Sequence, residues 1–369
     1  MNAAAQWFRS PFWQRLGKST GLFGRHLATR LLGFVLPVPA NQRVEDLPPV
    51  RSVLLVRPNF RIGNTILATP LIPALRELFP GAQLHVLGTE ITEPLLAHLS
   101  IDGVHVVSRG FILRPWRLLA LFRRLRAARL DVAVEAGMGS FSGGLYAWLS
   151  GARYRIGVEG PGARFLNVRV PRPLFAHAYD GIPRFARSLG AACDESLIYR
   201  VAPDEDATAA RILREHAGAE QDLDRGFVAL FVGGHLDKRL SHEQWTEILA
   251  QLERAEVRFV VLVGPEEQDF QRRLAADPRL AHHLLPPQPL RVFAAILARA
   301  AIVVTTDSGP MHLAVALGRP TIALLARERS RRFQPRGSDD RALMTPSADD
   351  VVETIRVHPA WATVARRVA

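Results

Sequence analysis

Residues 302–325, IVVTTDSGPMHLAVALGRPTIALL, constrain the fold more than any other stretch of the sequence. Both ends of the stretch, residues 302–305 and 321–325, are β-branched and apolar, as expected of strands buried on both faces of a parallel sheet. Pro310 suits the first turn of a helix between them, and Gly318 suits the end of that helix. The stretch therefore predicts a strand–helix–strand unit.

The turn Asp307-Ser308-Gly309 lies where the first of these strands ends and the helix begins. A helix amino end offers free N–H groups and a partial positive charge, which favour phosphate. His312 follows in the first helical turn, where a protonated imidazole would reach the same anion. Asp307 would accept hydrogen bonds from sugar hydroxyls or brace the turn. Ordinary helix capping explains the same residue types equally well, so the turn alone does not decide.

Length and charge narrow the class of protein. A chain of 369 residues favours two domains. The net charge of +12 indicates an anionic partner. Nucleic acid is not expected, because the arginines are scattered and no zinc-finger or helix-turn-helix pattern occurs. The single cysteine, Cys193, excludes an internal disulfide and favours a cytoplasmic location.

The amino-terminal residues 1–44 contain six basic residues and no acidic one. At helical spacing their apolar side chains share one face, which predicts a basic amphipathic helix. Such a helix either lies peripherally on an anionic membrane or packs against its own domain. It is not expected to span a bilayer, because its apolar run, residues 31–40, is short and contains Pro37 and Pro39.

The first half alternates strands with helices, which predicts a parallel sheet. Strands are expected at 53–56, 84–87, 104–107, 132–135 and 152–157. A helix is expected over 65–78, in which Pro70 and Pro73 either cause a kink or fall near the start. Residues 161–173 are expected to be irregular. The loop 57–63 lacks G-x-G-x-x-G, and no P-loop occurs, so no nucleotide cofactor is expected.

Glu135 ends one of these strands and is followed by Ala136-Gly137-Met138-Gly139. Its position places a carboxylate on the ligand-facing edge of the sheet. The carboxylate could serve as a general base or could cap the helix that ends near Leu149, and both roles stay open.

Three strand ends in the second half carry groups suited to a nucleotide diphosphate. Gly233 and Gly234 allow close backbone approach, and Lys238 suits phosphate. Either Glu266 or Glu267 would bind ribose, or both would simply stabilise the start of the next helix. The third strand end is the turn before His312. A capping box, formed by Ser241 with Gln244, marks a further helix start.

His282 and His283 are adjacent and would point apart in a strand. No partner at ligand spacing accompanies them, so no metal site is expected there.

With these motifs in place, the sequence resembles glycosyltransferase family 9, typified by the ADP-heptose lipopolysaccharide heptosyltransferases. The resemblance runs from about residue 51 to 335. Its most specific part is TTDSGPMHLAVALGRPTIALL, supported by RIGNTILATPLIPALRELFPGAQLHVLG and DKRLSHEQWTEIL. It implies an α/β fold of GT-B type, with two facing Rossmann-like domains, parallel sheets and an interdomain cleft. The implied boundaries are a basic arm with its linker at 1–47, an acceptor domain at 48–190 and a nucleotide-sugar domain at 191–369.

The resemblance also implies an activity: inverting, metal-independent transfer of a sugar from a nucleotide diphosphate donor to a lipid-linked glycan at the inner face of the inner membrane. By matching motif, the donor diphosphate would be held by Asp307, Ser308, Gly309, His312 and Lys238. Glu266 or Glu267 would take the ribose. The acceptor side would comprise Gly63, Asn64, Thr65 and the edge at Glu135.

Asn64 departs from the family pattern, in which the loop after the first strand commonly carries an aspartate proposed as the base. An amide does not accept the proton of a sugar hydroxyl. Either Glu135 is the base, or Asn64 positions the acceptor, or transfer has been lost.

The leading hypothesis is therefore transfer of heptose from ADP-heptose onto a lipopolysaccharide core. The alternatives are transfer from another nucleotide sugar, a non-catalytic protein that binds nucleotide sugars or glycolipids, and an anion-binding interaction protein whose affinity falls steeply with salt.

Overall fold

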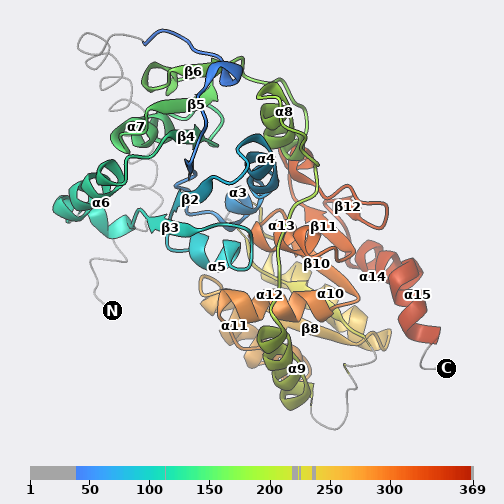
Figure 1. The fold of residues 1–369 in the computed structure, drawn as a ribbon. Coiled ribbons are helices and arrows are strands. Elements are labelled where there is room, and N and C mark those ends of the chain that lie inside the picture. The colour runs from blue at the N-terminus through green and yellow to red at the C-terminus, as the bar shows by residue number, and fades with distance from the viewer. Residues whose placement is uncertain (1–38, 113, 218–222, 224–225, 235–237, 367–369) are drawn as a thin grey trace. The chain divides into compact units, whose positions relative to one another are not determined.

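The computed structural model describes residues 39–112, 114–217, 223, 226–234 and 238–366 (Figure 1). Most of the predicted amphipathic arm at 1–44 lies outside these residues. By its internal contacts the chain divides into two compact units. The first comprises residues 1–56 and 111–172, and the second comprises 57–110 and 173–369. The domain boundaries expected at 47/48 and 190/191 stay predictions.

The strands form two six-stranded sheets, and every strand pair given with its register is parallel. The orders are β3-β2-β1-β4-β5-β6 and β12-β11-β10-β7-β8-β9. Numbered within its own sheet, each follows the doubly wound order 3-2-1-4-5-6, which is typical of Rossmann folds. The predicted α/β class is therefore confirmed. The strands are β1 (Ser52–Val56), β2 (Gln83–Gly88), β3 (Gly103–Val106), β4 (Val132–Glu135), β5 (Tyr154–Val158), β6 (Val168–Val170), β7 (Val228–Phe231), β8 (Phe259–Leu262), β9 (Leu284–Leu285), β10 (Ile302–Thr306), β11 (Thr321–Leu325) and β12 (Arg341–Met344).

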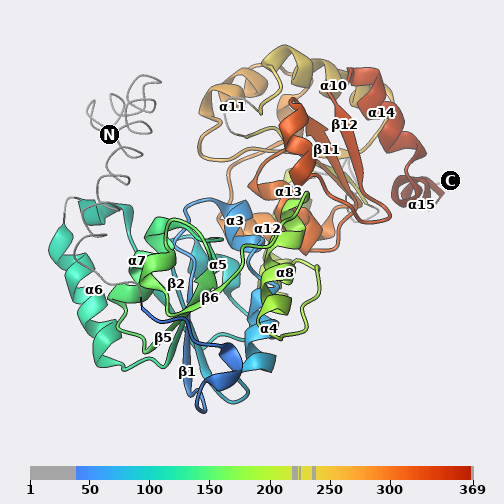
Figure 2. The same cartoon turned by 90° about the horizontal axis from the view of Figure 1, so that it is seen from above.

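The first unit carries the helices that follow β3 and β4 in the chain. They are α6 (Pro115–Ala127) and α7 (Phe141–Leu149), with short 3-10 turns η1 (Val44–Asp46) and η3 (Ala163–Phe165). A further turn, η2 (Arg109–Ile112), lies where the chain passes between units. Ser140 caps α7 by accepting a hydrogen bond from Gly143 N at 3.0 Å. α7 packs against β4 and β5 (Figure 2).

Strand β6 corrects the expectation that residues 161–173 are irregular. It pairs in parallel with β5, from Val168 opposite Ile156 to Val170 opposite Val158. A strand of three residues is too short to show an alternating pattern, so sequence periodicity gives no signal for it.

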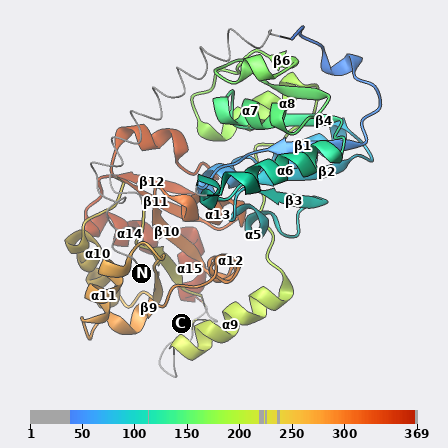
Figure 3. The same cartoon turned by 90° about the vertical axis from the view of Figure 1, so that its left-hand side faces the viewer.

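The second unit carries most of the helices. They are α3 (Ile62–Ile66), α4 (Leu71–Leu78), α5 (Thr92–Leu96), α8 (Gly181–Ser188), α9 (Pro203–Ala217), α10 (His242–Arg254), α11 (Gln268–Ala275), α12 (Leu290–Arg299), α13 (Gly309–Ala316), α14 (Ala348–Val357) and α15 (Pro359–Arg366). Short 3-10 turns are η4 (Ala178–Asp180), η6 (Ala281–His283) and η7 (Glu328–Phe333). α9 packs on α12 (Figure 1), and α10 lies beside α14 (Figure 3).

Local signals place several helix ends correctly. The expected capping box of α10 is present, with Gln244 N donating to Ser241 Oγ at 3.2 Å and Ser241 N donating to Gln244 Oε1 at 2.8 Å. The one helix expected over 65–78 is instead two helices, α3 and α4. Of the two alternatives for the prolines, the structure shows the second: Pro70 immediately precedes α4 and Pro73 lies in its first turn. Proline disfavours a helical residue before it and supplies no N–H, which explains the break.

The stretch 302–325 folds as predicted. All residues of β10 and β11 are buried, and the two strands pair in parallel. Helix α13 begins at Gly309, with Pro310 in its first turn. Gly318 follows the helix with φ +66°, a backbone conformation that favours glycine.

Two elements near the carboxyl terminus are not anticipated by the sequence pattern. β12 extends the second sheet beside β11, and α15 follows α14 after a single residue, His358. Within the described ranges, no helix combines the length and apolarity that crossing a bilayer requires.

Candidate functional site

The candidate site lies in the second unit, where β7 and β10 are neighbours and the strand order reverses. Ligands of open α/β sheets bind outside the carboxyl ends of strands at such a point. Asp307 and Ser308 follow β10 there, and the amino end of α13 begins at Gly309. Ser308 is extended and its side chain caps no helix N–H. The first N–H groups of α13 therefore stay available for an anion.

Lys238 and Asp307 form an ion pair across this edge. Lys238 Nζ lies 2.6 Å from Asp307 Oδ2, with side chains 25% and 5% exposed respectively. The ammonium group also lies 5.4 Å from the centroid of the Phe333 ring. Asp307 thus holds in place the lysine expected to reach phosphate. This role is not anticipated from the sequence, and it is distinct from the sugar binding and turn bracing considered there.

His312 is buried in the first turn of α13. Burial is the main cause that lowers its pKa to about 4, so the ring is neutral at pH 7. In the absence of an anion, desolvation outweighs the nearby Asp307 carboxylate. A bound phosphate would raise this pKa, so the protonated imidazole expected beside an anion stays a prediction. A neutral ring still donates one N–H to an anion.

Tyr179 fixes the other side of that ring. Its hydroxyl lies 3.0 Å from His312 Nδ1. Burial raises the pKa of Tyr179, so the hydroxyl keeps its proton. When the hydroxyl donates to Nδ1, the imidazole proton resides on Nε2, where it is a donor for a ligand.

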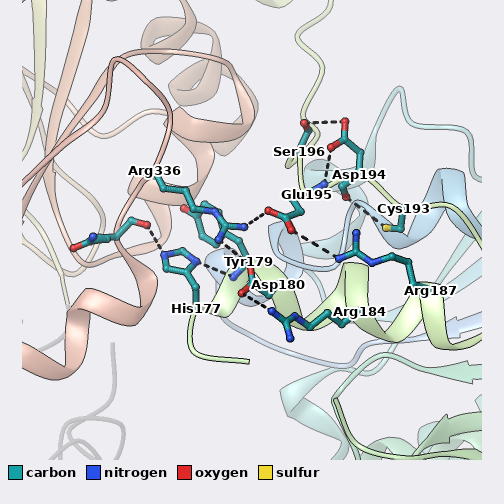
Figure 4. Close-up of polar contacts among 11 residues, drawn as sticks. His177, Tyr179, Asp180, Arg184, Arg187, Cys193, Asp194, Glu195, Ser196 and Arg336 are labelled. Atoms are coloured by element: carbon teal, nitrogen blue, oxygen red, sulfur yellow. Dashed lines mark hydrogen bonds and ion pairs between the residues drawn. The ribbon is translucent and has the colours of Figure 1, made fainter. Parts of the chain in front are cut away.

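A polar network holds Tyr179 in position (Figure 4). Arg336 pairs with Asp180 at 2.8 Å and with Glu195. His177 donates from Nε2 to the carbonyl of Gln334 at 2.9 Å and accepts at Nδ1 from Tyr179 N at 3.2 Å. The segment around Tyr179 is therefore tied to the chain that follows η7.

Gly63 in α3 packs directly against His312. A Cβ at position 63 would lie 2.5 Å from His312 Cδ2, and a Cβ at Gly309 would lie 2.8 Å from Ile62 Cβ. α3 and α13 therefore approach each other through two glycines, and side chains at either position would separate them. Thr65 is buried in the same short helix.

Asn64 is held as a hydrogen-bond donor. Asn59 Oδ1 accepts from Arg61 N at 2.9 Å, which identifies that atom as the amide oxygen. Asn64 Nδ2 donates to the same oxygen at 3.2 Å. A carboxylate at position 64 would place two acceptors against each other. The local structure is thus matched to asparagine rather than aspartate.

Glu267 supports the loops after β7 and β8. Its buried carboxylate accepts from Gly264 N at 3.1 Å, Gly234 N at 3.4 Å and Arg239 Nη2 at 3.0 Å. Glu266 is exposed and forms no hydrogen bond or ion pair with the described residues. Of the two acids expected at this edge, Glu266 is therefore the one available to a ligand.

Glu135 lies at the end of β4 in the first unit and is buried. Its Oε1 accepts from Gly137 N at 2.6 Å and from Ser140 Oγ at 3.0 Å, and its Oε2 accepts from Gly139 N at 2.8 Å. Both oxygens are engaged in the turn that starts α7. These bonds favour the bracing role over the general base among the two that the sequence left open.

Sequence reasoning missed Tyr179, Arg239 and Thr306. Thr306 Oγ1 donates to Gly233 O at 2.6 Å and fixes the glycine loop. The partners of Tyr179 and Thr306 are 133 and 73 residues away, so no local pattern reveals them. Arg239 directly follows Lys238, and this second basic residue beside the expected phosphate ligand is the only sequence signal for it.

The fold defines a class of protein: two six-stranded parallel sheets with flanking helices match the GT-B arrangement of solved heptosyltransferase structures. The chain belongs to glycosyltransferase family 9 (heptosyltransferase), whose sequence model matches residues 118–356.

Related proteins agree with this assignment. Lipopolysaccharide heptosyltransferase 1 of Escherichia coli (strain K12) is 31% identical over 115 residues, which are 30% of this chain and 36% of that protein. The sequence match thus spans about a third of the relative.

Solved structures share the fold. A glycosyl transferase family 9 protein from Veillonella parvula DSM 2008 has a TM-score of 0.69 and 17% identity, covering 89% of this chain and 97% of that chain. E. coli heptosyltransferase WaaC with ADP has a TM-score of 0.65 and 23% identity, covering 83% and 99%.

Proposed function

We propose that the chain transfers a sugar, with ADP-heptose as the first donor to test, onto a lipopolysaccharide core or a related lipid-linked glycan. One observation carries the proposal: the amino end of α13, Lys238 and the neutral His312 lie together at the edge of the second sheet where the strand order reverses. The names of the relatives, lipopolysaccharide heptosyltransferase 1 and a heptosyltransferase with ADP, support the choice of donor and acceptor. No metal or cofactor is assigned to this reaction.

In the proposed reaction the acceptor hydroxyl oxygen attacks the anomeric carbon from the face opposite the diphosphate. A carbon–oxygen bond forms, the bond to the diphosphate oxygen breaks, and the configuration inverts. Negative charge grows on the departing diphosphate. The α13 N–H groups, Lys238 and the His312 Nε2–H would stabilise that charge, because donors fixed in place need no reorganisation during the reaction.

The proton of the acceptor hydroxyl requires a base that Asn64 does not provide. We propose Asn64 as a positioning residue for the acceptor, because its amide is held by Asn59. Glu135 is the carboxylate proposed as the base from the sequence, although its hydrogen bonds favour a bracing role. The three hydrogen bonds that it accepts argue that it must give up one of them to take a proton.

The test is ADP release from ADP-heptose by the purified full-length chain, with and without a lipid A and inner-core acceptor. Acceptor-dependent release by the wild type supports the transferase. Glu135→Gln is compared with Ser140→Ala, which removes one bond to Glu135 and the α7 cap but keeps the carboxylate. A base role predicts loss of turnover in Glu135→Gln alone, whereas a bracing role predicts reduced stability in both variants.

A second candidate function is nucleotide-sugar binding without transfer. Its specific support is the donor–acceptor match between Asn64 and Asn59, at the position where the family pattern commonly has an aspartate proposed as the base. Saturable binding of ADP-heptose with no acceptor-dependent ADP release, in folded protein, would favour this function and contradict the transferase.

We also propose a cytoplasmic position at the inner face of the inner membrane. The support is the basic, acid-free composition of residues 1–44. The full chain should float with anionic liposomes, and deleting residues 1–44 should abolish this flotation. Neither protein should float with neutral liposomes, which serve as the control. Unchanged flotation after the deletion would instead fit an arm that packs on its own domain.

A further inference from the structure

His282 and His283 do not lie in a strand, which corrects the premise on which a metal was not expected. They end the 3-10 turn η6, and their ring centroids are 3.9 Å apart with an interplanar angle of 40°. Neighbouring side chains differ in direction by about 120° in a 3-10 turn and by about 180° in a strand. The two imidazoles are therefore side by side.

His283 presents a bare nitrogen in a buried place. The side chain is 4% exposed and stacks on Phe259, with centroids 3.8 Å apart and planes at 22°. Its Nδ1 lies 3.2 Å from the carbonyl oxygen of Phe259. Because a carbonyl only accepts, Nδ1 carries the proton and Nε2 carries a lone pair. That Nε2 is buried and has no hydrogen-bond partner among the described residues.

A carboxylate completes the group. Glu253 lies near the end of α10, and one oxygen of its carboxylate, one nitrogen of His282 and one of His283 all lie within 4.8 Å of one another. His282 is exposed and Glu253 half-buried, so both are open to ions from solvent. His216 at the end of α9 also interacts with both histidines, and its own Nε2 is buried without a partner in the described chain.

We propose that Glu253, His282 and His283 bind a divalent transition-metal ion, with Zn²⁺ as the expected ion. Two imidazoles and one carboxylate form a donor set that zinc takes in proteins, usually with a further ligand. The hydrogen bond from His283 Nδ1 to a backbone carbonyl is the outer-shell contact that orients metal-binding histidines. Ligand atoms around one tetrahedral zinc are about 3.3 Å apart. Reaching that spacing from the present separation of up to 4.8 Å requires side-chain rotation of the exposed His282 and of Glu253.

The place of the group in the fold argues for a structural role. Phe259 begins β8 and His283 immediately precedes β9, so the group lies at the amino edge of these strands. Gly264 and Glu267 lie beyond the opposite end of β8, about 10 Å or more away. A bound ion would join the end of α10 to η6, remote from the proposed donor site. The inference is therefore independent of the proposed transferase.

The competing explanation is a histidine pair that merely packs beside an acid. Arg279 is the cation near Glu253, and its pKa is raised mainly by Asp277, with which it pairs at 3.2 Å. Glu253 thus has no ion pair of its own among the described residues, which leaves its carboxylate free for another cation.

The test uses the full chain without an affinity tag, freed of metal by a chelator, and titrates it with Zn²⁺ in a calorimeter. We expect one Zn²⁺ per chain and a higher melting temperature when Zn²⁺ is bound. His282→Ala and Glu253→Gln should each weaken binding at least about tenfold and remove the thermal shift. Both changes affect accessible side chains, so the variants should remain folded.

His98→Ala is the matched control, because His98 is an exposed histidine 3.9 Å from a carboxylate, that of Glu205, without a second histidine. It should bind Zn²⁺ like the wild type. Absence of saturable binding to the wild type, or equal binding in all three variants, would overturn the proposal.

Discussion

The hydroxyl of Tyr179 lies 3.0 Å from Nδ1 of His312, and both residues are buried. Tyr179→Phe keeps the ring but leaves Nδ1 without its partner. Burying an unsatisfied group costs about 1–3 kcal/mol, so the free energy of unfolding should fall by that order. ADP affinity should fall about 3- to 10-fold, because the orientation of the Nε2–H is lost. Urea denaturation measures the free energy of unfolding, and calorimetry measures the affinity for ADP. Tyr146→Phe, in the first unit, is the control, and a similar loss of ADP affinity in that variant would contradict a specific role of Tyr179.

Stability should depend on pH through His312. Burial lowers its pKa to about 4, whereas in the unfolded chain it titrates near its ordinary value of 6.5. Between these values the unfolded state binds a proton that the native state does not, so stability falls as pH falls. Above pH 6.5 the group contributes nothing to the slope. The difference between wild type and His312→Gln should change by about 2 kcal/mol between pH 7.5 and pH 5. Urea denaturation measures the free energy of unfolding of both proteins across this pH range. A constant difference between the wild type and His312→Gln would refute the prediction.

Gly63→Ala should disturb the contact between α3 and α13. The new Cβ would lie 2.5 Å from His312 Cδ2, and relieving such a contact costs about 1–3 kcal/mol. We expect a lower melting temperature and weaker ADP binding. Gly110→Ala is the control, because its Cβ would meet only Ser108 Oγ at 3.5 Å. Equal effects of the two substitutions would show that the contact with His312 is unimportant.

Substitutions of Glu266 and Glu267 should have different effects: the first on ligand binding and the second on the stability of the loops. Glu267→Gln turns an amide toward groups that all donate, namely Gly264 N, Gly234 N and Arg239, and should cost about 1–3 kcal/mol of stability. Glu266→Gln should leave stability within about 0.5 kcal/mol of the wild type, as surface changes usually do. If Glu266 binds ribose, its substitution weakens ADP binding but not pyrophosphate binding. Unaltered ADP affinity would remove Glu266 from the site.

Lys238 and Asp307 should show strong coupling. Lys238→Met leaves the buried Asp307 carboxylate without its partner, and we expect a loss of about 1–3 kcal/mol after allowing for the partial exposure of the lysine. Adding Asp307→Asn should restore most of that stability, while ADP affinity stays low because the cation is missing. A double-mutant cycle tests this, and additive losses would contradict a direct pair.

Local sequence signals predicted the parts of the fold that local physics decides. The β10–α13–β11 unit follows from two buried runs with Pro310 and Gly318 between them, and the start of α10 follows from Ser241 and Gln244. These features depend on residues within one turn or strand of each other. The same reasoning placed Lys238 and the 307–309 turn at one sheet edge, because carboxyl ends of parallel strands lie together.

The features that the sequence did not predict depend on partners far away in the chain, or on segments too short to show a periodic pattern. An acid after a strand can face a ligand or the loop's own N–H groups, and only the structure shows that Glu267 does the latter. The proton state of His312 depends on burial by elements far away in the chain. The pair His282-His283 spans too few residues for any periodicity to distinguish a turn from a strand.

The close approach of α3 and α13 through Gly63 and Gly309 has a consequence for how substitutions in this family should be interpreted. The helix that carries Asn64 and the helix that carries His312 meet as part of the fold itself. A ligand that contacts both therefore finds them preorganised and does not have to meet the entropic cost of bringing them together. Substitutions that loosen this contact lower affinity without touching a ligand atom, so a loss of binding does not by itself identify a contact residue.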